Sequence, residues 1–142
     1  TLARQIANWV IIYSPLQMAA DLIENYEGHP AFRFFRDFDA DCDWSKALQG
    51  EIGDYIVVAR RAKDRYFLGA GTDEKARTLV QKLDFLEPGV TYTATIYADA
   101  PDAGRNPEAY LIGKRAVTER DTIRIEMAER GGQTITFIPA EK

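Results

Sequence analysis

The sequence is poor in the side chains that most often carry chemistry. Its 142 residues contain a single cysteine, Cys42, and a single histidine, His29. A lone cysteine can neither close a disulfide within the chain nor build a cysteine metal site. His29 lies between Gly28 and Pro30, which is turn chemistry and not the setting of a Ser–His or Cys–His nucleophile. We therefore predict no catalytic residue and no metal ligand in this chain.

Two further absences narrow the choice of partners. No apolar run reaches the ~18 residues that a membrane-spanning helix needs. The net charge is −4, and acids follow the basic cluster at Arg60, Arg61 and Lys63 within a few positions, whereas phosphate binding needs a continuous basic face. We expect neither a membrane nor a nucleic-acid partner. Arg60 and Arg61 are expected in surface ion pairs, with an anion site as the alternative.

The acids at alternate positions between Asp37 and Asp43 invite a calcium interpretation. An EF-hand loop that begins at Asp37 needs glycine at position 42 and glutamate at position 48, where the sequence has Cys42 and Leu48. The register that begins at Asp39 fails in the same way. We interpret this run as a solvated linker between two parts of the chain.

The part before the linker predicts helices. Apolar residues spaced as on one helical face run through 2–13, and Pro15 ends that helix. The short apolar run 16–20 is consistent with a buried strand. Asp21 then caps a second helix, with Glu24 completing a capping box. Pro30 opens a third short helix, whose inward residues are Phe34, Phe35 and Phe38.

After the linker the hydrophobic period becomes two, and turn residues recur every 8–12 positions, which is typical of an antiparallel sandwich. We predict an α+β fold with N-terminal helices in residues 1–40 and a β-sandwich of about eight strands in residues 41–142. The expected strands are Trp44–Ile52, Tyr55–Ala62, Arg65–Gly71, Arg77–Leu83, Thr91–Ala98, Tyr110–Val117, Thr122–Ala128 and Thr134–Ile138.

Strand aromatics suggest one binding function. Exposed tyrosine and tryptophan rings stack on sugar rings, so the chain could be a stand-alone carbohydrate-binding module. On alternating strands about half of the side chains point inward, however, and core packing is the better interpretation for most of them. The aromatic positions are Trp44, Tyr55, Tyr66, Tyr92, Tyr97 and Tyr110.

Several sequence blocks together resemble the C-terminal region of glycoside hydrolase family 97. The two strongest are Ser14–Asp21, within Tyr13-Ser-Pro-Leu-Gln-Met-Ala-Ala-Asp21, and Asp54–Arg61, within Gly53-Asp-Tyr-Ile-Val-Val-Ala-Arg-Arg61. Weaker blocks are Glu24-Asn-Tyr-Glu27, Tyr66-Phe-Leu-Gly69 and Leu83-Asp-Phe-Leu86. The resemblance covers nearly the whole chain. The apolar start, which suits the interior of a larger protein, agrees with a chain that ends a longer enzyme.

The resemblance implies a bacterial α-glycosidase, periplasmic or secreted, that hydrolyses α-glucosides or α-galactosides with calcium in its active site. Residues 1–40 would be the end of its catalytic (β/α)₈ barrel, and its catalytic carboxylates would lie upstream. By this likeness Gln17 and Asp21 would be the residues nearest the substrate, although an N-cap is the simpler role for Asp21. This chain would be inactive alone and would pack on the barrel. Its apolar N-terminal segment would also favour self-association.

Overall fold

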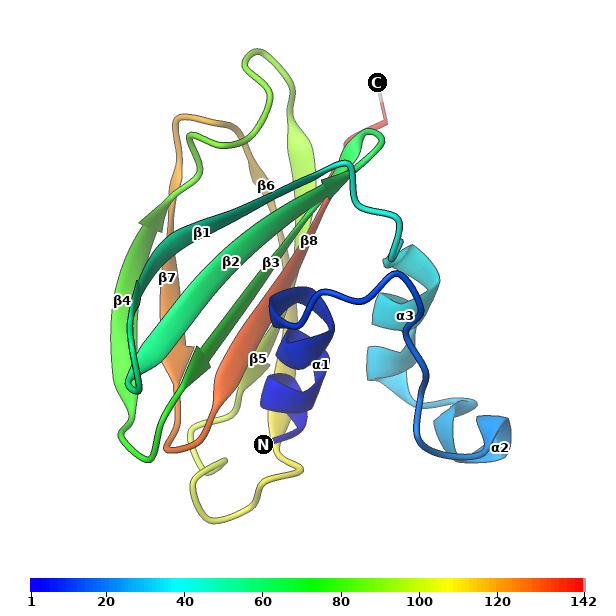
Figure 1. Cartoon of the computed structure of the whole chain (residues 1–142), viewed down its shortest axis with the longest axis vertical. Helices are drawn as coiled ribbons and strands as arrows, with labels where there is room; N and C mark the ends of the chain where they lie inside the picture. Colours follow the sequence, from blue (N-terminus) through cyan, green and yellow to red (C-terminus); the bar gives the residue numbers. More distant parts are fainter. Residues whose placement is uncertain (142) are drawn as a thin grey trace.

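The computed structural model describes residues 1–141, and its strands form two antiparallel sheets (Figure 1). The larger sheet has the strand order β1-β2-β3-β8-β5-β6, and the smaller one pairs β4 with β7. The α+β prediction with eight strands is confirmed. The strand bounds are β1 Trp44–Glu51, β2 Tyr55–Ala62, β3 Arg65–Thr72, β4 Arg77–Lys82, β5 Tyr92–Asp99, β6 Tyr110–Val117, β7 Thr122–Met127 and β8 Gly132–Pro139.

Turn chemistry fixes the register of the hairpins. Gly53 has φ +86° between β1 and β2, and Lys63 has φ 58° between β2 and β3. A positive φ matches the twist that tight hairpins require, and glycine adopts it without a side-chain clash. From these turns β2 and β3 pair without interruption, Tyr55 opposite Thr72 and Ala62 opposite Arg65.

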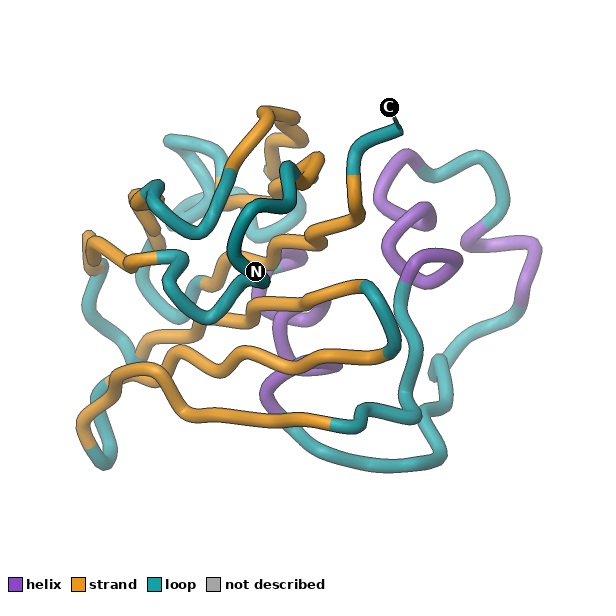
Figure 2. The backbone as a smooth tube through the Cα atoms, turned by 90° about the horizontal axis from the view of Figure 1, so that it is seen from above, coloured by secondary structure: helices purple, strands orange, loops and turns teal. Residues whose placement is uncertain are grey.

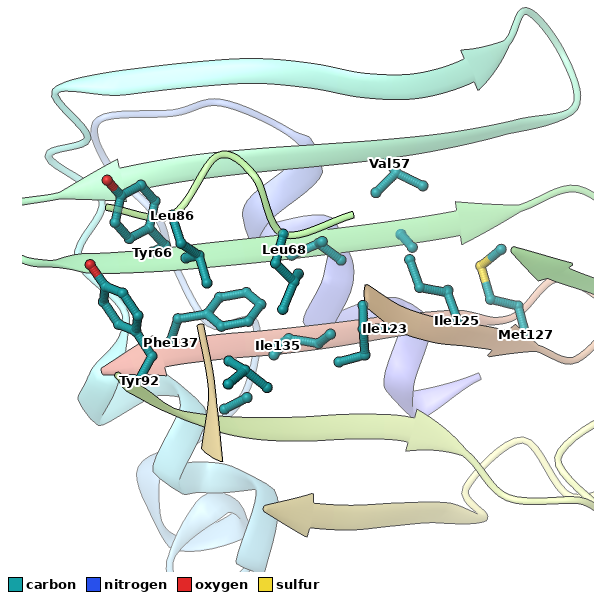
Figure 3. Close-up of a cluster of buried hydrophobic side chains, with 14 residues drawn as sticks. Val57, Tyr66, Leu68, Leu86, Tyr92, Ile123, Ile125, Met127, Ile135 and Phe137 are labelled. Carbon is teal, nitrogen blue, oxygen red and sulfur yellow. The ribbon is translucent and has the colours of Figure 1, made fainter. Parts of the chain in front are cut away.

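The main core lies between the two sheets (Figure 3). Alternate residues of β3 and β8 point into it, among them Leu68, Ile135 and Phe137, and β7 supplies Ile123 and Ile125 from the other side. Each of these five side chains is at most 3% exposed. Burying one such side chain stabilises the fold by roughly 1.5–3 kcal/mol. This core holds the two sheets together.

The opposite face of the six-stranded sheet is covered by α1 (Leu2–Ile11). Ala3, Ile6, Ala7 and Val10, which fall on one helical face, are all buried there. The amphipathic helix predicted at residues 2–13 is thus confirmed, although it ends two residues earlier. It packs on the sheet of this chain, so it belongs physically to the β-domain. Whether residues 1–40 also complete a barrel stays a prediction.

The chain between α1 and β1 forms short elements beside the sheets (Figure 2). They are α2 (Ile23–Tyr26), the 3₁₀ helix η1 (Pro30–Phe32) and α3 (Arg33–Asp37). Phe34 is fully buried against the outer face of the sheet, and Phe38 packs beside it, as predicted. Among the described residues, none of the helices has the length and apolar character that crossing a membrane requires.

Two local predictions are wrong. Residues 16–20 form bends and irregular backbone, not a strand. At their start, Ser14 Oγ accepts from Leu16 N at 3.3 Å and donates to Leu16 O at 2.6 Å, which closes a local turn. The capping box at Asp21 is also absent: the N-cap of α2 is Leu22, without a side-chain cap bond.

Candidate interaction surface

The predicted substrate-proximal residue Gln17 serves the end of α1. Its Nε2 donates to the carbonyl oxygens of Trp9 and Ile12, both at 3.2 Å. The last carbonyls of a helix have no partner within the helix, so these bonds satisfy acceptors that would otherwise need water. Gln17 therefore ties the segment after α1 back to the helix, and its amide is engaged.

Asp21 lies on the surface, where its carboxylate organises the start of α2. Its Oδ1 accepts from Leu22 N and from Asn25 Nδ2, each at 2.7 Å. The Asn25 bond first, and the backbone bond second, hold the pKa of this carboxyl below its usual value. Asp21 is therefore ionised at neutral pH, as a negative charge at the rim of the groove described below.

The segment between Gln17 and α2, extended to residues 12–23, is the most apolar exposed part of the chain. We call residues 12–23 the docking segment. Its six large apolar side chains expose between 60% and 79% of their surface, at Ile12, Tyr13, Leu16, Met18, Leu22 and Ile23. Large exposed apolar patches mark interaction sites of several kinds, among them protein–protein contacts.

A groove of about 480 Å³ lies beside the docking segment. Aromatic rings of Trp9, Tyr26, Phe32 and Phe35 line it, and Trp9 and Phe35 pack edge to face at 4.7 Å between centroids. Aromatic side chains supply large apolar contact area at low entropic cost. The docking segment contributes Met18, Ala19, Ala20 and Asp21 to the lining of this groove, so the groove and the segment adjoin each other.

Sequence reasoning missed how this surface is held in place. Arg60 was expected in a surface ion pair, but it is 5% exposed. Its Nε donates to Val10 O, its Nη2 donates to Ile11 O at 3.2 Å, and its Nη1 donates to Ser45 Oγ at 2.8 Å. A cation at the C-terminal end of a helix is favourable because of the helix dipole. Arg60 therefore holds the end of α1, where the docking segment begins, against the sheet.

The helix start is anchored by a second arginine that the sequence analysis did not select. Arg4 Nη1 donates to Thr72 O at 2.8 Å and to Gly131 O at 3.4 Å, and its Nε donates to Asn8 Oδ1 at 3.0 Å. The carbonyl acceptors lie at the end of β3 and just before β8. The spacing of residues in the sequence does not predict such long-range contacts, because they join positions up to 127 apart.

Three of the five strand tyrosines lie in the core. Tyr66, Tyr92 and Tyr97 are at most 5% exposed, which confirms core packing for these three. Burial raises the pKa of Tyr97 to about 12. Tyr55 lines an open cleft of about 520 Å³, but the guanidinium of Arg77 lies over its ring, 5.5 Å from the ring centroid. The same guanidinium pairs with two of the three carboxylates that line the cleft, Asp54 and Asp73.

His29 and the acidic run are also engaged locally. The Nδ1 of His29 accepts from Ala31 N at 3.2 Å, and its ring lies 5.3 Å from that of Tyr110. Asp39 pairs with Lys63 Nζ at 3.4 Å. In residues 1–141, His, Cys, Asp and Glu side chains nowhere gather in groups of three that could hold a metal ion. The calcium implied for the parent enzyme thus finds no ligand set in this part of the chain.

Comparison with known proteins shows which family has this architecture. Residues 41–138 match the family described as glycosyl-hydrolase 97 C-terminal, oligomerisation. The chain is 32% identical over 133 residues to a retaining alpha-galactosidase of Bacteroides thetaiotaomicron, which covers 93% of this chain and 20% of that protein. The match therefore spans about a fifth of the relative's length.

Solved structures of related enzymes lead to the same family. Complexes of a glycoside hydrolase family 97 enzyme from a Pseudoalteromonas species with panose and with acarbose superimpose with a TM-score of 0.94 at 44% identity, covering 99% of this chain and 23% of that one. A beta-arabinopyranosidase shares the fold, with a TM-score of 0.74 at 22% identity. With residues 41–138 matching its C-terminal region, this chain belongs to glycoside hydrolase family 97.

Proposed function

We propose that this chain is the non-catalytic C-terminal region of an α-glycosidase, and that the docking segment packs against the catalytic domain. The main observation behind it is the exposure of six large apolar side chains in residues 12–23, next to an aromatic groove that Met18 also lines. The superposition over 99% of this chain on a much longer family 97 enzyme supports the proposal.

The energetics favour a permanent contact. Full burial of one large apolar side chain contributes roughly 1.5–3 kcal/mol, and the docking segment exposes six of them. Arg60 and Gln17 hold the start of the segment, so less conformational entropy is lost when it docks. In an isolated chain the same side chains would favour self-association, which is the second use we propose for this surface.

The parent reaction is proposed from the relatives. A retaining alpha-galactosidase and an enzyme solved with panose and acarbose point to hydrolysis of α-galactosides or α-glucosides. Glycoside hydrolysis needs two carboxyl groups on either side of the scissile bond, and we place both outside this chain. Calcium would belong to that other part as well. We propose that Gln17 and Asp21 face the catalytic domain, and that the parent is periplasmic or secreted in a bacterium.

Calorimetry tests the docking. The chain is titrated into the Pseudoalteromonas enzyme truncated to remove the region that this chain matches. We expect binding that the double substitution Leu16→Ser with Met18→Ser weakens at least tenfold. Val80→Ser is the matched control, because Val80 is 66% exposed on β4 of the smaller sheet, outside the docking surface. Equal affinity of the double variant and the control would contradict the proposal.

The stand-alone carbohydrate-binding module is the rival function. It predicts heat on titration of the isolated chain with maltooligosaccharides or α-galactosides, lost on Tyr55→Ala. We expect no heat at millimolar ligand, because Arg77 engages both the Tyr55 ring and the neighbouring carboxylates. The isolated chain is also expected to release no product from p-nitrophenyl α-glucoside or α-galactoside.

A further inference from the structure

The two edges of the six-stranded sheet differ in how they are protected. At one edge, β1 carries a register shift between Ala47 and Gln49. Gln49 Nε2 also reaches across to the smaller sheet and donates to Val80 O at 3.2 Å. Bulges and side-chain covers of this kind keep an edge strand from pairing with another chain. At the other edge, β6 has neither device within the described chain.

β6 is a straight edge strand with exposed side chains. All eight of its residues pair in unbroken register with β5, from Tyr110 opposite Asp99 to Val117 opposite Tyr92. Residues 111–116 are all exposed. Leu111 exposes 54% of its surface on one face of the sheet, and Ile112 exposes 39% on the other. The edge also carries the exposed charges of Lys114 and Arg115, but an eight-residue edge strand without a bulge or a covering segment still offers its free backbone groups for strand addition.

The ladder identifies which backbone groups of β6 are free. Ala100 N donates to Ala109 O at 3.2 Å. Hydrogen-bonded pairs alternate along an antiparallel ladder, so Leu111 and Gly113 bond to β5, and the residues between them point their N–H and C=O away from the sheet. The outward residues are Tyr110, Ile112, Lys114 and Ala116.

We propose that a second copy of this chain pairs antiparallel with β6 around a two-fold axis at Gly113, so that the two six-stranded sheets become one. An antiparallel strand pair related by a two-fold axis is self-complementary, which suits a homodimer. The family description names oligomerisation without naming a surface. The β6 edge would be that surface, and its pairing does not require the docking segment.

The side chains favour a two-fold axis at Gly113 over an axis at Ile112 or at Lys114. With the axis at Gly113, all four outward residues find partners, Ile112 with Lys114 and Tyr110 with Ala116 of the second copy. An axis at Lys114 would place two like charges directly opposite, which is destabilising. An axis at Ile112 would leave Ala116 without a partner in the other strand. The Gly113 register is therefore the one that uses the whole edge.

The presence of a glycine at position 113 also supports a two-fold axis there. A Cβ added at this position would meet no atom within 4 Å, and its φ is not in the positive region. Nothing within the described chain therefore requires glycine there. At the two-fold, Gly113 would face its own copy in a non-hydrogen-bonded pair, where Cα atoms approach to about 4.5 Å. Glycine in a strand often marks such a close approach of another backbone.

Amide hydrogen exchange on the 142-residue chain, followed by NMR at dilute and at near-millimolar protein, tests the proposal without any substitution. We expect the amides of Ile112, Lys114 and Ala116 to gain protection at least tenfold at the higher concentration. The Gly113 amide, which bonds to β5, is protected at both and is the internal control. Outward amides that exchange at the same rate at both concentrations would overturn the proposal.

Two variants of one residue give the second test, by light scattering after gel filtration. Ile112→Pro removes an N–H that the monomer does not use, which edge strands tolerate, whereas Ile112→Thr keeps that N–H. We expect the wild type and the threonine variant to reach twice the 16.0 kDa chain mass, and the proline variant to dissociate at roughly tenfold higher concentration or more. Unchanged self-association of the proline variant would refute β6 pairing. Loss of association only in the Leu16→Ser, Met18→Ser variant would assign it to the docking segment.

Discussion

The guanidinium of Arg60 on β2 donates to the carbonyl oxygen of Val10, in the last turn of α1. Both residues are buried, Val10 completely and Arg60 to 95%, since 5% of its surface is exposed. A buried cation is tolerated only where its donors are used. Here they meet helix carbonyls, which have no partner within the helix, so one side chain satisfies the helix end and joins it to the sheet.

We expect Arg60→Met to lower the free energy of unfolding by about 2–4 kcal/mol, because it leaves the buried carbonyl oxygen of Val10 and the partly buried one of Ile11 without this donor. Urea unfolding followed by circular dichroism measures this change. The matched control is Arg61→Met on the same strand. The Nε of Arg61 donates to Lys63 O in an exposed bond, so this substitution should lower the free energy of unfolding by less than about 1 kcal/mol. Equal losses in the two variants would show that Arg60 does not anchor the helix.

The same residue shows why the sequence predicted the strands better than their surroundings. β2 and β6 have the bounds expected from the sequence, Tyr55–Ala62 and Tyr110–Val117, because period-two patterning and turn residues are local signals. Arg60, in contrast, has the same local pattern as an exposed arginine. Its burial depends on α1, about 50 residues away in sequence, and no local rule contains that information.

The candidate surface was only partly predictable for a related reason. The apolar character of residues 12–23 is visible in the sequence, but a short apolar run does not distinguish a buried strand from an exposed segment. The structure resolves this because α1 turns its apolar face to the sheet while Ile12 and Tyr13 remain exposed. The place of Gln17 and Asp21 relative to a substrate stays a prediction.

Gly69→Ala should disturb the contact between α1 and the sheet. A Cβ at Gly69 would lie 2.8 Å from both Ala7 O and Val10 Cβ, closer than van der Waals contact allows, and a helix backbone cannot move aside as a side chain can. Overpacking of this kind costs typically 1–3 kcal/mol. Gly104→Ala, where the added Cβ meets nothing within 4 Å, is the control. Thermal unfolding should show a lower midpoint for Gly69→Ala alone; a common midpoint would contradict close packing at this position.

Part of the loss of folding stability at alkaline pH should come from ionisation of the Tyr97 phenol. Burial raises the pKa of this phenol to about 12 in the folded chain, against an ordinary value near 10 in the unfolded chain. The unfolded state therefore loses its proton first, so the Tyr97 contribution to stability is complete below pH ~10 and declines between pH ~10 and ~12. The loss should appear in urea unfolding measured at successive pH values.

Tyr97→Phe removes this titrating group and tests its share of the pH dependence. The Tyr97 hydroxyl is buried and has no hydrogen-bond partner among the described residues, so the substitution should cost less than about 1 kcal/mol at pH 7. Between pH ~10 and ~12 its stability should fall less steeply than that of the wild type. The control is Tyr13→Phe, because Tyr13 is 60% exposed and should leave the slope unchanged. A wild-type slope in Tyr97→Phe would show that other groups cause the alkaline loss of stability.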